Sequence, residues 1–140
     1  MQLDDITGAV IDASIRIHRD LGPGLVESVY ELVLAAVLER RRLHVARQQP
    51  VAFSYDGMEF EHGFRIDLLV ESRVIVELKS VERISPVHPK QLLTYLRLTD
   101  LRVGLLLNFG ADTMKEGIKR VVNDFPRSST AHLHVNQPPI

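Results

Sequence analysis

The sequence FRIDLLVESRVIVELKS at Phe64–Ser80 predicts a β-hairpin, because two runs rich in isoleucine, leucine and valine flank a polar loop at Glu71–Arg73. With a loop of this length, Asp67 on the first strand lies opposite Glu77 on the second. Lys79 shares the face of Glu77, since successive strand side chains alternate between the two faces of a sheet. The opposite face is apolar and suits a hydrophobic core: Val74, Val76 and Leu78.

The facing carboxylates of Asp67 and Glu77 present an electrostatic conflict. Directly paired strand side chains have Cβ atoms roughly 5 Å apart, and like charges at that distance repel. A divalent cation would remove the conflict, since Mg²⁺ is commonly held by one or two carboxylates together with waters and phosphates. Lys79 would then lie beside the ion, placed to contact a phosphate or to orient a water. The alternative is a solvent-facing side of an edge hairpin, with Lys79 neutralising Glu77.

Length and composition narrow the class of protein. The 140 residues suffice for one domain with a single core, which we expect over residues 1–125, followed by a C-terminal tail at 126–140. A formal net charge of −1 argues against a generally basic nucleic-acid-binding surface but allows a local basic patch. The absence of cysteine excludes disulfides, zinc–thiolate sites and thiol catalysis. Without a secretory signal or an apolar run of about 20 residues, a soluble cytoplasmic protein is expected.

Two helices are predicted before the sheet. Leu3–Leu21 has the three-and-four spacing of an amphipathic helix, which the Gly22–Gly24 segment ends. The second helix, Val26–Arg42, is apolar on nearly every side, and this pattern predicts burial on more than one face. Glu27 stands near its start among these apolar residues. Its carboxylate is either favoured there by the helix dipole or points inward at the site of Asp67.

Strands are predicted on either side of the central hairpin. Val45–Tyr55 and Met58–Phe60 flank an Asp-Gly turn signal, and the central hairpin follows after a glycine. Arg102–Phe109 is an almost uninterrupted apolar run, which is typical of a strand covered on both faces. The type of Asp112–Asn123 stays open, because its apolar spacing fits a helix and a strand equally.

A third helix is predicted at about Pro89–Thr99, with proline tolerated in its first turn. Gln91 and Tyr95 are four residues apart and therefore share one face of this helix. They form either an exposed pair or a polar pair directed at the site. His132 and His134 near the carboxyl end would share one face of a short strand, and the sequence favours bystanders over ligands.

Four motifs follow one another along the chain: Gly24–Tyr30, Asp67 with Glu77-Leu78-Lys79, Gln91 with Tyr95, and Gly104–Gly110. The carboxylates and lysine resemble the signature of the PD-(D/E)XK nuclease superfamily. The glutamine and tyrosine resemble the QxxxY motif of its RecB-like branch, and the first motif resembles the one that names the GxxExxY family, whose members are assigned to this superfamily. The resemblance covers about Ile6 to Val122.

The resemblance implies an α/β fold of the α+β type, namely a restriction-endonuclease-like core in which a mixed central β-sheet of four or more strands is flanked by α-helices. It also implies a metal site. Asp67, Glu77 and the main-chain carbonyl of Leu78 would hold Mg²⁺ or Mn²⁺, and Glu27 would be a further ligand or would orient one.

The function implied by the resemblance is metal-dependent hydrolysis of phosphodiester bonds in DNA or RNA. Lys79 would orient or help to activate water, while Gln91 and Tyr95 would contact the substrate or support the site. The alternatives are an inactive module of the same fold that binds nucleic acid or a protein partner, and a hydrolase of smaller phosphate esters. A homodimer is compatible with each. Loss of Asp67 or Glu77 is expected to abolish cleavage and to leave the metal-free fold intact or steadier.

Overall fold

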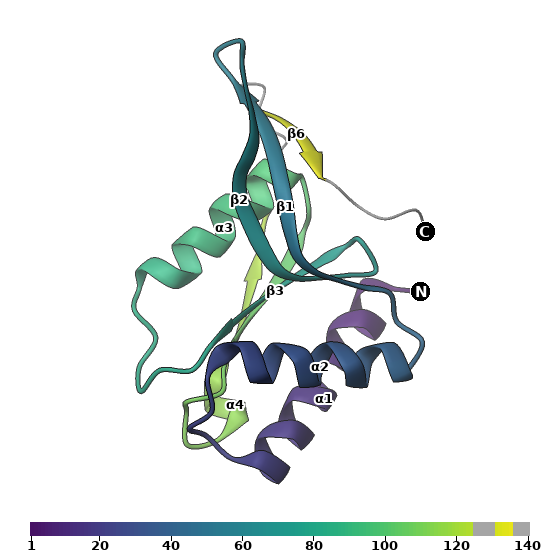
Figure 1. Ribbon diagram of the computed structural model, residues 1–140, viewed down its shortest axis with the longest axis vertical. Helices are drawn as coiled ribbons and strands as arrows, with labels where there is room; N and C mark the ends of the chain where they lie inside the picture. Colours follow the sequence, from purple (N-terminus) through teal and green to yellow (C-terminus); the bar gives the residue numbers. More distant parts are fainter. Residues whose placement is uncertain (125–130, 136–140) are drawn as a thin grey trace.

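The computed structural model describes residues 1–124 and 131–135. Its elements are α1 (Leu3–Leu21), α2 (Glu27–Arg40), β1 (Val45–Tyr55), β2 (Met58–Val70), β3 (Val74–Lys79), α3 (Val87–Thr99), β4 (Val103–Asn108), α4 (Met114–Gly117), β5 (Ile118–Val122) and β6 (Ala131–Val135). The strands form one mixed sheet in the order β5-β4-β3-β2-β1-β6, in which only β3 and β4 pair in parallel among the described strands (Figure 1). The predicted fold class is confirmed.

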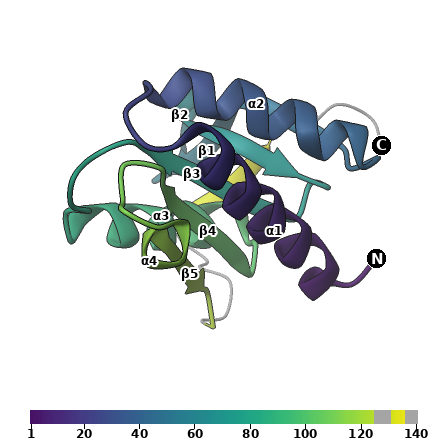
Figure 2. The same cartoon turned by 90° about the horizontal axis from the view of Figure 1, so that it is seen from below.

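Helices cover both faces of this sheet, with α2 and α3 on opposite sides (Figure 2). One core lies between the sheet and the helices α1 and α2, and a second core lies between the sheet and α3. Strand β3 contributes Val74, Val76 and Leu78 to the first core and Ile75 to the second, as the alternation of strand side chains requires. The predicted apolar face of the hairpin is therefore confirmed.

The central hairpin pairs as predicted, with Val70 opposite Val74 and Leu68 opposite Val76. Its second strand, however, does not lie at an edge of the sheet. Strand β3 pairs with β2 on one side and with β4 on the other, because α3 supplies the crossover that parallel neighbours need. The alternative of a solvent-facing edge hairpin is therefore wrong.

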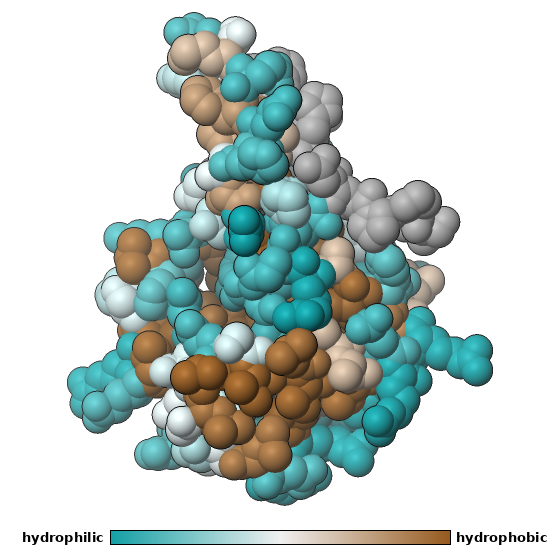
Figure 3. All heavy atoms as spheres, in the orientation of Figure 1, coloured by the Kyte–Doolittle hydropathy of each residue, from teal (hydrophilic) through white to brown (hydrophobic). Residues whose placement is uncertain are grey.

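Helix α2 is buried on one face only. Tyr30, Leu34 and Leu38 are fully buried, whereas Leu32 is 51% exposed and the preceding N-cap residue Val26 is 65% exposed. The prediction of burial on more than one face was wrong, because no described element packs against the outer side of this helix. The outer side forms a hydrophobic patch at the front of the molecule (Figure 3).

Strand β2 is continuous from Met58 to Val70, where the sequence predicted a short strand and a separate hairpin strand divided at Gly63. A Cβ atom at Gly63 would lie 2.2 Å from Cε1 of Phe53, so the glycine allows close packing of the facing strand rather than a break. The pairing register shifts between Val51 and Phe53, next to this contact. Beyond it, the β1–β2 hairpin extends past the helices (Figure 1).

The segment Asp112–Asn123, whose type the sequence left open, contains both a helix and a strand, since the single helical turn α4 leads directly into β5. Within the predicted tail, β6 pairs with the outer half of β1. His132 and His134 lie in β6, but their side chains are outside the described residues. Among the described helices, none is long and apolar enough to cross a membrane.

Candidate active site

A cleft of about 540 Å³ lies where the amino end of α2 meets β1, β2, β3 and α3. It brings together every site residue that the sequence predicted: Glu27, Asp67, Glu77, Leu78, Lys79, Gln91 and Tyr95. It also contains polar residues that sequence reasoning did not assign to a site: Ser28, Glu31, Arg47, Gln48 and Arg65. The cleft is therefore built by five elements that are distant in the sequence.

Asp67 lies just beyond the last paired residues of β2 and β3, which are Leu68 and Val76. Its Oδ2 accepts a hydrogen bond of 2.9 Å from the main-chain N–H of Leu78. The aspartate thus takes the place of a missing backbone acceptor at the point where the two strands separate. This bond fixes Asp67 against the strand that carries Glu77 and Lys79.

Glu77 is the most strongly perturbed acid of the cleft. Burial raises the pKa of its carboxyl group from 4.5 to about 10, and a hydrogen bond to Asp67 and repulsion by that carboxylate add to the effect. The positive charge of Lys79 opposes this pKa shift only in part. Oε1 of Glu77 is buried and has no hydrogen-bond partner within the described residues. Without a cation, Glu77 is therefore protonated at neutral pH.

Tyr95 and Gln91 form the wall of the cleft on α3. Burial raises the pKa of the Tyr95 phenol, and the nearby carboxylates of Glu77 and Asp67 raise it further. The ring of Tyr95 stacks on Phe64, with ring centroids 4.1 Å apart. The phenol therefore stays neutral and can donate a hydrogen bond into the cleft.

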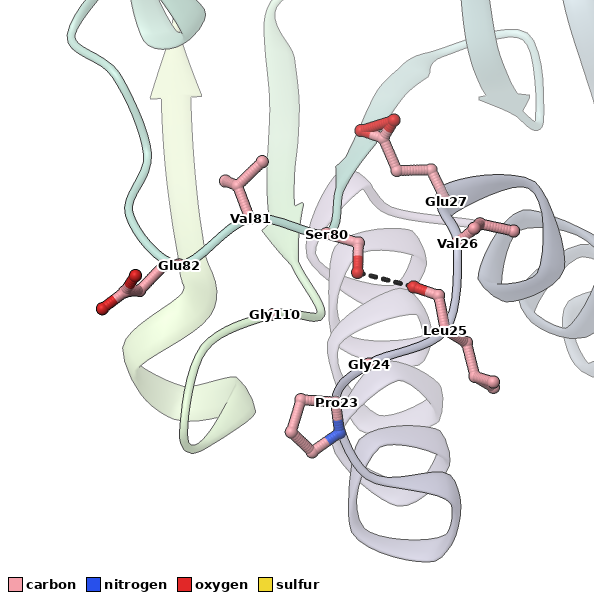
Figure 4. A pocket seen from close by; sticks show the side chains of 9 residues that line it. All are labelled: Pro23, Gly24, Leu25, Val26, Glu27, Ser80, Val81, Glu82 and Gly110. Carbon is pink, nitrogen blue, oxygen red and sulfur yellow. Dashed lines mark hydrogen bonds between the residues drawn. The ribbon is translucent and has the colours of Figure 1, made fainter.

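Glu27 is the first residue of α2 and lines the cleft from that side. The hydroxyl of Ser80 donates a 2.7 Å hydrogen bond to the carbonyl of Leu25, so the end of β3 is tied to the start of α2. Figure 4 shows this bond in an adjacent cavity of about 580 Å³, with the Glu27 carboxylate directed away from Pro23. The tie holds Glu27 near the end of the strand that carries Lys79.

Glu31 is a second acid of α2 at the cleft, one helical turn after Glu27 and only 5% exposed. Its Oε2 accepts a hydrogen bond of 3.2 Å from Nη2 of Arg47, and its Oε1 accepts one of 2.6 Å from Nε2 of Gln48. The spacing of the two glutamates could have indicated Glu31, because residues four apart share a helix face. No local signal indicated Gln48, whose position depends on the pairing of β1 with β2.

The donor set at Asp67 and Glu77 fits a hard divalent cation. An unpartnered buried oxygen on Glu77 beside a second carboxylate is the arrangement that such an ion would satisfy. Across residues 1–124, the described histidine, aspartate and glutamate side chains form no converged group of three or more for a metal ion. Glu27 thus lines the cleft but does not form a converged group of three metal-ligating side chains with Asp67 and Glu77.

Comparison with family models gives a match over residues 4–121 to the model described as the PD-(D/E)XK nuclease superfamily. Neither the comparison with curated proteins nor the comparison with solved structures gave a match. The matched range runs from α1 into β5 and contains every residue that lines the cleft.

Proposed function

Because the chain belongs to the PD-(D/E)XK nuclease superfamily, we propose that it is a metal-dependent nuclease that hydrolyses phosphodiester bonds of DNA or RNA in this cleft. The observation that carries the proposal is the Asp67–Glu77 pair, in which a buried carboxyl oxygen lacks a partner within the described residues. Lys79 lies in the same cleft and supplies a cation beside the pair.

Asp67, Glu77 and the main-chain carbonyl of Leu78 would hold Mg²⁺ or Mn²⁺. When bound, such an ion lowers the pKa of a coordinated water and neutralises the charge that develops on the phosphate. Glu77 would hold such an ion only as a carboxylate, its proton going to solvent, because a ligating carboxylate must be ionised. Glu27 is proposed to ligate the ion or to orient one of its ligands from the start of α2.

The other side chains of the cleft would act on water and substrate. Lys79 orients the attacking water, and Gln91 and the neutral Tyr95 phenol donate hydrogen bonds to the substrate backbone. Arg65 is exposed in the cleft two residues before Asp67, and its side chain makes no hydrogen bond or ion pair with another described residue. Its guanidinium is therefore available for a phosphate.

The alternative function is an inactive module of the same fold that binds nucleic acid or a protein partner. One feature favours it: burial and the neighbouring Asp67 raise the pKa of Glu77 to about 10, so the pair is tolerated without a metal. Metal affinity separates the two proposals, because the module would have no use for an ion at this pair.

A homodimer through the outer side of α2 is also proposed. The exposed apolar residue Leu32 lies between Glu27 at the amino end of α2 and the basic Arg40–Arg42 segment at its carboxyl end, and the exposed Val26 directly precedes Glu27. A two-fold antiparallel pairing of this helix with that of a second copy would cover the hydrophobic patch of each copy. It would also bring the acidic amino end of one helix close to the basic carboxyl end of the other. Light scattering should give a dimer for the wild type and a monomer for Leu32→Glu, whereas Ile15→Glu on exposed α1 surface should stay dimeric. A monomeric wild type would contradict this pairing.

The decisive experiment measures Mn²⁺-dependent cleavage of single-stranded DNA, double-stranded DNA and RNA. We expect cleavage by the wild type, none by Glu77→Gln, and a rate lower by about 10²–10⁴ for Lys79→Ala. Glu61→Gln is the matched control, since Glu61 is an exposed acid on β2 outside the cleft. A wild type that neither cleaves any substrate nor binds Mn²⁺ in calorimetry would support the inactive module instead.

A further inference from the structure

Gln48 has an unusual backbone conformation in the middle of β1. Its φ angle is 49°, in the left-handed region that favours glycine and is strained for most other residues. Among the described residues, the other non-glycine positions with positive φ lie at helix ends or in turns: Arg42, Asp56, Glu71, Ser72 and Asp100. Gln48 is thus the one described case inside a strand.

Sheet pairing does not require this conformation. Arg47 pairs with Leu68 and Gln49 pairs with Ile66, so the register of β1 against β2 is the same on both sides of Gln48. An ordinary extended residue at position 48 would continue this pairing opposite Asp67. A strained residue in such a place persists only if its surroundings hold it, and strain of this kind gathers at functional sites.

What holds Gln48 is a pair of hydrogen bonds from its side-chain amide. Nε2 lies 2.6 Å from Oε1 of Glu31 and 3.4 Å from Oδ1 of Asp67. Glu31 is itself buried and bound by Arg47 through its other oxygen, so it offers a fixed acceptor. The amide therefore links a carboxylate on α2 to a carboxylate on β2.

The bond from Gln48 completes the fixation of Asp67. The main-chain N–H of Leu78 holds Oδ2, and the Gln48 amide holds Oδ1. With both oxygens engaged from different strands, the carboxylate plane of Asp67 cannot rotate freely. Its orientation toward Glu77 is then set by the fold before any ligand arrives.

We propose that Gln48 is a positioning residue. Its side-chain amide is held by the buried acceptor Glu31 and orients the Asp67 carboxylate, and the left-handed backbone at position 48 places the amide between them. The inference rests on the proposed function, because the orientation of Asp67 matters for holding a divalent ion. Gln48 itself needs to touch neither the ion nor the reacting atoms.

The test replaces Gln48 by glycine, which accepts positive φ without strain and removes only the amide side chain. We expect the Mn²⁺ affinity of Gln48→Gly to fall about 10- to 100-fold in calorimetry, the range found for residues that orient metal ligands. The Tm of the metal-free protein should change little, because relief of the backbone strain offsets the loss of the hydrogen bonds to Glu31 and Asp67. In cleavage assays kcat should fall while KM for the nucleic acid stays unchanged.

Two further variants sharpen the result. Asp56→Gly is the matched control, since Asp56 has φ 51° at the tip of the β1–β2 hairpin and lies outside the cleft. It should leave Mn²⁺ affinity and kcat unchanged. Gln48→Asn tolerates the same backbone but is one methylene shorter, so it should behave like the glycine variant.

The outcomes distinguish this inference from the proposed function. If the wild type binds Mn²⁺ and Gln48→Gly binds it equally well, the positioning role is overturned and the nuclease proposal stands. A lower Tm of Gln48→Gly in step with its lost affinity would also overturn it, since the residue would then serve the fold. If the wild type binds no Mn²⁺ and cleaves nothing, the proposed function falls and this inference falls with it.

Discussion

The two faces of β3 differ in how their side chains are satisfied. On one face Val76 and Leu78 are both buried in the core against α1 and α2, where burial of apolar surface stabilises the fold. On the other face Glu77 is half-buried beside Asp67, and its buried Oε1 has no hydrogen-bond partner within the described residues. Adjacent residues of one strand thus serve stability and candidate chemistry separately, because strand side chains alternate.

The largest expected effect comes from the apolar face. Leu78→Ala should lower the free energy of unfolding by about 2–5 kcal/mol, because it leaves a cavity in the core. Urea denaturation measures this change. Mn²⁺ affinity of the folded variant should be unchanged, since only the main-chain carbonyl of Leu78 is proposed as a ligand. Lost affinity with unchanged stability would contradict the separation of the two faces.

Glu77→Gln tests the polar face through its pH dependence. The pKa of Glu77 is about 10 in the folded protein and 4.5 as the ordinary value, so between these values the folded state keeps a proton that the unfolded state loses. Metal-free stability should therefore fall as pH rises, by up to about 3 kcal/mol from pH 6 to pH 8. The glutamine variant should lack this pH-dependent contribution, so its free energy of unfolding should increase relative to that of the wild type as pH rises. Parallel pH profiles in urea denaturation would refute the buried-acid interpretation.

Asp67→Ala has a smaller effect, and the structure changes its expected sign. Relief of charge repulsion predicted an intact or steadier metal-free fold, but Glu77 is protonated and Asp67 accepts the N–H of Leu78. Loss of that acceptor should cost about 1–3 kcal/mol of unfolding free energy. Asp67→Asn keeps an acceptor oxygen and should cost less. Equal stability of the alanine and asparagine variants would show that the bond to Leu78 is unimportant.

Arg65→Gln should give the smallest effect, and only on substrate binding. If Arg65 contacts one phosphate, the slope of log affinity against log salt concentration should fall by about 0.7–0.9. Fluorescence anisotropy with a labelled oligonucleotide and the cleavage-deficient Glu77→Gln protein measures it. Arg102→Gln is the control, because Arg102 is exposed beside the opposite end of β3 and β4. Equal slopes for both variants would exclude Arg65 as a phosphate contact.

The sequence predicted some features of the cleft and missed others for one physical reason. Asp67, Glu77 and Lys79 follow from the turn and the period of a single hairpin, which are local properties. Gln48 reaches the cleft only through contacts between α2, β1 and β2, and no local period indicates it, whereas Glu31 could have been indicated by its helical spacing from Glu27. The left-handed backbone of Gln48 is likewise a property of its partners rather than of its residue type.

Local physics therefore determined the bounds of α1 and the pairing of the central hairpin, because turn chemistry and hydrophobic period act over a few residues, whereas the fold class was predicted from the resemblance of the motifs to a known superfamily. The tertiary structure decided the rest. It placed β3 in the middle of the sheet through the parallel pairing with β4, and so covered Glu77 in part. It left the outer side of α2 uncovered and joined β2 across Gly63, because burial depends on which elements pack together and not on how apolar a segment is.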